Sequence, residues 1–173
     1  MHKALHTDKH LELVFLEVYF TAIDFLESEW GFRPIACLEG LVAELWYRKY
    51  GAIIHFVFDA RDIVVNVRMH LKGTAIPDVF PPEAFPDVYS RIQDPLFDLF
   101  LRLPYREERQ QFFSKVQRRR LEQLRDAAVM QRDIEAARAV LEAEAEFDAY
   151  MLRKYQSQIL QVVEAVSAES AEA

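Results

Sequence analysis

The fold is decided by Ile63-Val64-Val65-Asn66-Val67-Arg68-Met69-His70-Leu71, in which an apolar residue occupies every second position. This period of two is typical of a β-strand with one buried face and one face largely in water. Residues 52–58 form a second apolar run, and the polar residues 59–62 are a short link, so the two runs are predicted to pair as an antiparallel hairpin. Residues 41–50 predict a third strand and residues 33–39 a fourth.

An amphipathic helix is predicted before these strands. Residues 11–30 place apolar side chains at steps of three and four, which is the spacing of one helical face. Thr7 or Asp8 is expected to cap the start of this helix, and Gly31 is expected to end it. Residues 1–72 are therefore predicted to form a helix packed on a three- or four-stranded antiparallel meander, which is an α+β fold.

The second half of the chain is predicted to be helical. Residues 73–86 contain four of the seven prolines and form a predicted connector. After Pro104 there is no glycine or proline, and strong helix formers dominate to the end of the chain, so residues 87–173 are predicted to form a helical region. A short helix is expected over residues 87–103, followed by either one very long helix or a helical hairpin whose second helix Asp133 caps.

Charge favours the hairpin over the single long helix. Residues 105–125 contain seven basic and three acidic residues, whereas residues 133–148 contain six acidic residues and one basic residue. Folding the two segments against each other would pair opposite charges, within one chain or between two chains. A homodimer formed through these C-terminal helices is therefore a second predicted arrangement.

Composition narrows the class of protein. Half of the 173 residues are hydrophobic, which is enough for a packed core, and the single cysteine, Cys37, cannot form an internal disulfide. A reducing, cytoplasmic location is expected, and the polar N-terminus fits neither a signal peptide nor a membrane span. The net charge of −7 disfavours nucleic acid and anionic membranes as partners.

The candidate chemical groups each lack a second element that catalysis or metal binding requires. His2, His6 and His10 are spaced for one helix face but have no further histidine or cysteine nearby. His55 and His70 have no accompanying nucleophile or phosphate-binding glycine loop. The acidic residues of the C-terminal half are expected to form a solvated helix face, because residues two apart point in different directions. These are Glu142, Glu144, Glu146 and Asp148. No catalytic residue, cofactor or metal site is predicted.

The chain is instead interpreted as a protein-binding protein. Aromatic and arginine side chains are enriched in protein interfaces, and here they occur on the face of the meander expected to be exposed and on the basic helical segment. The candidate partner-binding residues are Trp46, Arg48, Tyr50, His55, Arg61, Arg68, His70, Arg118 and Arg119.

Two runs in the first half carry a resemblance to known proteins. They are Asp24-Phe25-Leu26-Glu27-Ser28-Glu29-Trp30-Gly31-Phe32 and, after Tyr47-Arg48, Ile53-Ile54-His55-Phe56-Val57-Phe58-Asp59-Ala60-Arg61. The runs resemble small bacterial proteins that open with a helix ending in an acidic Gly-Phe turn and continue into a strand pair with an Asp-x-Arg link. Many of these resemble immunity proteins, which neutralise a cognate toxin by binding it. The resemblance spans about residues 10–72 and implies a toxin domain as partner, but no particular binding residues.

A structural or adaptor protein that forms homo-oligomers through its C-terminal helices is the alternative function. A small enzyme that uses His55 or His70 is a third, less supported interpretation.

Overall fold

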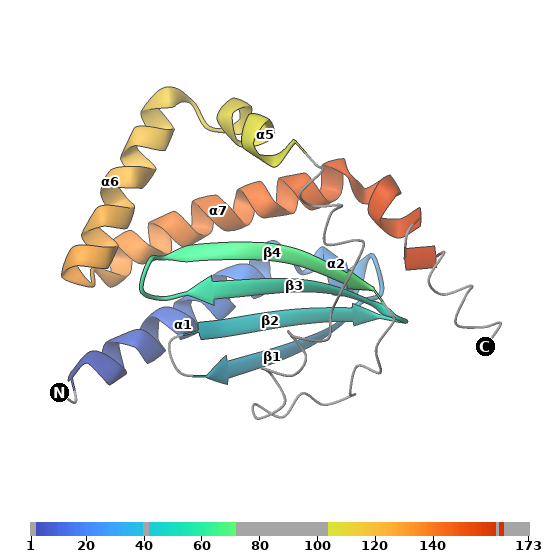
Figure 1. Cartoon of the computed structure of the whole chain (residues 1–173), viewed down its shortest axis with the longest axis horizontal. Helices are drawn as coiled ribbons and strands as arrows, with labels where there is room; N and C mark the ends of the chain where they lie inside the picture. Colours follow the sequence, from blue (N-terminus) through green and yellow to red (C-terminus); the bar gives the residue numbers. More distant parts are fainter. Residues whose placement is uncertain (1–2, 40–41, 72–103, 162, 165–173) are drawn as a thin grey trace.

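The computed structural model describes residues 3–39, 42–71, 104–161 and 163–164, and the predicted connector 73–86 and short helix 87–103 lie outside these ranges. The fold is α+β: an N-terminal helix, a four-stranded antiparallel sheet in the order β1-β2-β3-β4, and C-terminal helices (Figure 1). This confirms the predicted fold class, including the fourth strand. The elements are α1 (Lys3–Ala22), α2 (Phe25–Ser28), β1 (Arg33–Glu39), β2 (Val42–Lys49), β3 (Ala52–Asp59), β4 (Val64–Leu71), α5 (Tyr105–Phe112), α6 (Lys115–Gln131) and α7 (Ile134–Lys154).

The β3–β4 hairpin forms as predicted, with one difference at its turn. The Asp59 carboxylate accepts a hydrogen bond from the Arg61 backbone N–H at 2.9 Å, which stabilises the link. Ile63, expected to be the first residue of the strand, adopts φ +52° in the turn, and β4 begins at Val64. The Ile63 side chain is nevertheless buried and belongs to the hydrophobic core, although the residue is not part of the strand.

The N-terminal helix is longer at its start and shorter at its end than predicted. It begins at Lys3, so Thr7 and Asp8 lie inside the helix and do not cap it. It ends at Ala22, and the short helix α2 follows. On the sheet side, the Phe15 ring stacks on Phe58 with centroids 5.0 Å apart, so this helix face and the sheet share one core.

Gly31 adopts the left-handed conformation predicted for it, but it follows the short helix α2 rather than ending the long N-terminal helix. Its φ is +75°, and the Phe32 N–H closes the turn by donating to the Leu26 carbonyl at 2.8 Å. A Cβ at this position would lie 3.4 Å from Nζ of Lys49, which itself donates to the Trp30 carbonyl at 2.7 Å. The added Cβ would make only an ordinary van der Waals contact with Lys49, so the turn requires glycine for its conformational freedom.

Substituting Gly31→Ala is expected to lower the free energy of unfolding by about 1 kcal/mol, because alanine is strained at positive φ. Urea denaturation followed by circular dichroism measures this change. The matched control is Gly51→Ala, since Gly51 is not among the positive-φ glycines of the described residues. The control should be neutral or slightly stabilising, and equal losses in both variants would contradict the assigned role of Gly31.

The C-terminal helices form a hairpin and pack on α1. Asp133 caps α7 by accepting a hydrogen bond from the Ala136 N–H at 3.1 Å, as the sequence predicted. Helix α7 runs along α1, and its buried Val140, Leu141 and Ala145 belong to the core that α1 shares with the sheet. Figure 1 shows α6 rising from the start of α7, with α5 leading back toward the far end of α7. A smaller apolar cluster of Phe113, Leu121, Phe147 and Met151 joins these three helices.

Candidate functional site

Trp46 and His55, predicted to be exposed partner-binding residues, are buried. They lie opposite each other in the β2–β3 register, and their rings stack with centroids 3.6 Å apart. Neither side chain is more than 1% exposed, and Nε2 of His55 lies 3.4 Å from Oε1 of Glu44. Burial lowers the pKa of His55, which favours the neutral imidazole. The expectation that this face of the sheet is wet is therefore wrong for these two residues.

The remaining predicted residues of the sheet are spread along it. Arg68 is half-buried and lies opposite His55 in the β3–β4 register, so the structure brings Trp46, His55 and Arg68 onto neighbouring strands. Tyr50 and Arg61 are exposed in the turns at opposite ends of β3. Nε of Arg48 donates to the Tyr50 carbonyl at 3.5 Å. His70 pairs with Ile53 in the β3–β4 register, and its side chain lies outside the described part of the structure.

Arg118 and Arg119 lie near the start of α6, the end of this helix that Figure 1 places away from the sheet. Arg118 donates to the backbone carbonyls of Gln110 and Phe113, at 2.6 and 2.9 Å, so it stabilises the turn between α5 and α6. Arg119 is exposed. The two neighbouring arginines therefore have different environments, and Arg119 is the one that a partner can reach.

The acidic residues of α7 do not form one solvated face. Glu142 and Glu146 are exposed, but Glu144 and Asp148 are buried, at 7% and 2% exposure. The expectation of a solvated cluster is wrong for the second pair. The signal was present in the sequence, because Glu144 and Asp148 follow Val140 and Leu141 at helical spacing and so continue the apolar stripe.

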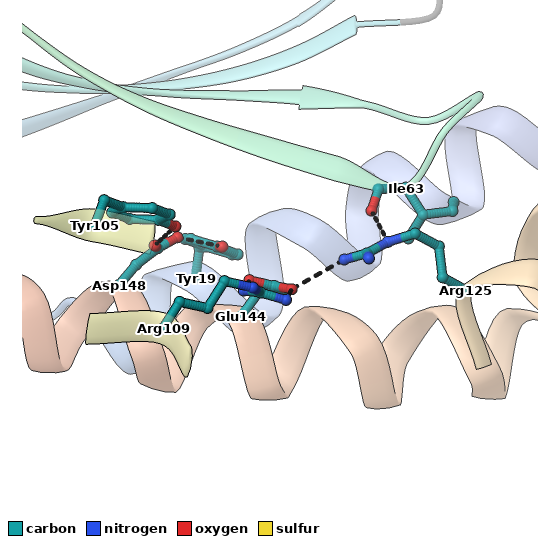
Figure 2. Close-up of polar contacts among 7 residues, drawn as sticks. All are labelled: Tyr19, Ile63, Tyr105, Arg109, Arg125, Glu144 and Asp148. Atoms are coloured by element: carbon teal, nitrogen blue, oxygen red, sulfur yellow. Dashed lines mark hydrogen bonds and ion pairs between the residues drawn. The ribbon is translucent and has the colours of Figure 1, made fainter. Parts of the chain in front are cut away.

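Glu144 is held by two arginines (Figure 2). The Arg109 guanidinium donates to both of its carboxylate oxygens, and Nη2 of Arg125 donates to Oε1 at 2.9 Å. Arg125 also donates through Nε to the Ile63 carbonyl at 3.2 Å. This arrangement is the charge pairing that the sequence predicted between the basic and acidic helical segments, and it occurs within one chain. It connects α5, α6 and α7 with the β3–β4 turn.

Asp148 accepts two hydrogen bonds from tyrosines of different helices. The hydroxyl of Tyr19, on α1, donates to Oδ2 and that of Tyr105, on α5, donates to Oδ1, each at 2.8 Å (Figure 2). Burial raises the pKa of Asp148 to about 7, although both hydrogen bonds act in the opposite direction. Burial and the neighbouring carboxylate also raise the pKa of Tyr19. No local sequence pattern predicts this site, since its members are far apart in the chain.

A third carboxylate, Glu108, ties α5 to the end of α7. Nζ of Lys154 lies 2.5 Å from its Oε1, and the hydroxyls of Tyr150 and Tyr155 donate to the same carboxylate at 3.4 and 3.2 Å. The adjacent ammonium holds the pKa of Glu108 below its usual range. Glu108, Glu144 and Asp148 therefore each join separate helices, which indicates that the three carboxylates serve the architecture.

Two grooves lie beside α7. The first, between α1 and α7, has a volume of about 390 Å³ and is lined in part by Val18, Ala145 and Ala149. The second, among α5, α6 and α7, has a volume of about 450 Å³ and a floor that includes Phe112, Phe113 and Leu121. Glu146 borders both grooves, and neither is lined by His55, Glu144 or Asp148.

Within the described ranges, no group of three or more His, Cys, Asp or Glu side chains is arranged to hold a metal ion. None of the helices in this part of the chain combines the length and the apolar character needed to cross a bilayer.

Comparison of the chain with protein-family models, with curated proteins and with solved structures gives no match. The resemblance to immunity-type proteins therefore stays a prediction from the two sequence runs around Gly31 and Asp59.

Proposed function

We propose that this chain is a non-enzymatic, cytoplasmic protein of the immunity type, which neutralises a bacterial toxin by binding it directly. The observation that supports this proposal most is the separation of the buried ionisable groups from the grooves. The buried carboxylates Glu108, Glu144 and Asp148 contact arginine, lysine and tyrosine side chains of neighbouring helices. Each of the two grooves beside α7 combines apolar side chains with a charged or polar border.

Such an arrangement fits binding better than catalysis. A catalytic acid or base must reach the substrate, within hydrogen-bond distance or through one water. Asp148, whose pKa of about 7 would suit a proton-transfer role, is instead enclosed by Tyr19, Tyr105 and the helices that carry them. An apolar groove with a polar border, in contrast, is the usual anatomy of a protein interface.

The experiment uses the toxin gene that is expected beside the gene for this chain. Cells that express this toxin should survive only when the full chain is co-expressed, and a tagged chain should retain the toxin through affinity and size-exclusion chromatography. A matched control replaces the chain by a variant with Leu141→Asp and Ala145→Asp, which places charges in the core shared by α1 and α7 and should abolish folding. Loss of viability in the presence of the wild-type chain, with no complex recovered, would rule out the proposed function.

A further inference from the structure

The groove between α1 and α7 has a shallow apolar floor made of small side chains. Val18 and Ala22 contribute to it from α1, and Ala145 and Ala149 contribute from α7. Small side chains on two adjacent helices allow a third helix to approach closely, and the ridges of that helix can then lie in the depression between them. An amphipathic helix placed in an apolar groove is a recurrent mode of peptide recognition.

Charge determines which kind of helix fits. The groove is bordered by three carboxylates, those of Glu17, Glu142 and Glu146, and by one guanidinium, that of Arg138. Arg138 is already engaged, because its Nη2 lies 3.2 Å from Oε2 of Glu17 across the groove. The lining therefore has a net charge of −2. Glu142 and Glu146 are exposed, and neither belongs to the ion pair between Arg138 and Glu17. A basic segment is attracted to such a border, and an acidic one is repelled.

The second groove differs in this respect. Its border contains Arg120 and Glu146, one residue of each sign, and its floor combines two phenylalanines with leucine and alanine side chains. This mixed border does not select a partner of either sign. The net charge of the whole chain, −7, attracts a basic partner over a longer distance, and the acidic border of the α1–α7 groove can then bind it.

We propose that the groove between α1 and α7 is the docking site for a basic amphipathic helix of the partner protein, with its small apolar residues on the alanine floor and its lysines or arginines at Glu142 and Glu146. That the partner is a toxin rests on the proposed function. The position of the site rests on the groove alone. The site can therefore be tested with and without a toxin.

The first test uses a synthetic amphipathic helical peptide of Lys, Ala and Leu, and a second peptide in which every Lys is replaced by Glu. Titration of the full ¹⁵N-labelled chain with the Lys peptide should shift amide resonances of Val18, Ala22, Ala145 and Ala149, and the Glu peptide should leave them unchanged. Shifts confined to α6, or no shifts with the Lys peptide, would overturn the assignment of this groove.

The second test uses a pair of matched charge reversals on exposed helical glutamates. Glu142→Arg, in the groove border, should weaken binding of the Lys peptide about tenfold in low salt, and added salt should reduce the difference between this variant and the wild type. Glu122→Arg, on α6 and outside both groove linings, changes the net charge by the same amount and should alter binding less than about twofold. Equal effects of the two reversals would show that only the overall charge attracts the peptide, and the proposed site would be rejected.

The toxin then separates the two proposals. If the Lys peptide binds the groove but the chain neither binds nor neutralises the toxin, the docking site stands and the immunity function fails. If the toxin is neutralised and Glu142→Arg has no effect on its affinity, the function stands and the docking site fails.

Discussion

Replacing Glu144 by glutamine is expected to lower the free energy of unfolding by about 3 kcal/mol. Glutamine keeps the size of the side chain but removes the charge that two guanidinium groups share. Arg109 and Arg125 would then face each other around a neutral amide. Their side chains are 25% and 26% exposed, so water compensates part of the loss, and the effect should lie at the low end for a broken buried ion pair.

Urea denaturation followed by circular dichroism measures this loss. The matched control is Glu142→Gln, which removes the same charge from the solvent-exposed side of the same helix and should change stability by less than about 0.5 kcal/mol. If both variants lose the same stability, Glu144 does not anchor α5 and α6. If Glu144 does anchor these helices, a double-mutant cycle that adds Arg109→Met should reveal a coupling energy of at least about 1 kcal/mol between positions 109 and 144.

The second large effect concerns Asp148 and depends on pH. The carboxyl group of Asp148 has a pKa of about 7 in the folded chain, compared with 3.8 for an unperturbed aspartate. The folded state therefore keeps its proton at pH values where the unfolded state has already lost it. This contribution to stability is fully present below about pH 4 and is lost as the pH rises toward 7.

Substituting Asp148→Asn removes this titration. Each pKa unit corresponds to about 1.4 kcal/mol, so the variant should gain up to about 4 kcal/mol relative to the wild type between pH 4 and pH 8. The comparison must be made with the groups that face Asp148 unchanged: Tyr19 on α1, Tyr105 and Arg109 on α5, and Glu144 on α7. Denaturation of both proteins at several pH values tests this. A constant difference across that range would mean that Asp148 is ionised in the folded protein.

Tyr19→Phe provides an independent check on the same group. The tyrosine hydroxyl donates to Oδ2 of Asp148 and thereby lowers its pKa, so its removal should raise the pKa further. The free energy of unfolding of Tyr19→Phe should therefore become independent of pH at a higher pH than that of the wild type. No shift would indicate that this hydrogen bond does not act on the ionised carboxylate.

Local signals in the sequence predicted much of the fold. Gly31 and Asp133 were recognised as helix boundaries because each acts on backbone groups within a few residues. The β3–β4 hairpin was recognised because alternation and a short polar link both lie within about twenty residues. The start of α1 was placed too late because Thr7 and Asp8 are good caps in isolation, although nothing before them breaks a helix.

The candidate site was harder to predict, because it depends on contacts between distant segments. Tyr19 and Asp148 are separated by 129 positions, and no local pattern relates them. Trp46 and His55 were expected in water because polar or aromatic residues on the second face of a strand usually are, but both side chains are buried in the folded chain. The α1–α7 groove likewise requires knowing that α7 packs along α1.

The proposed binding function requires a fixed stoichiometry between chain and toxin, which catalysis by the chain would not require. Purified toxin at a fixed concentration would be mixed with increasing amounts of the chain, and the residual toxin activity would be measured after several incubation times. A binding protein should reduce the activity in proportion to its concentration, reach the end point at an equimolar ratio, and give the same curve at all times. Progressive inactivation by a small fraction of an equivalent of the chain would contradict the account, because it would show that the chain turns over.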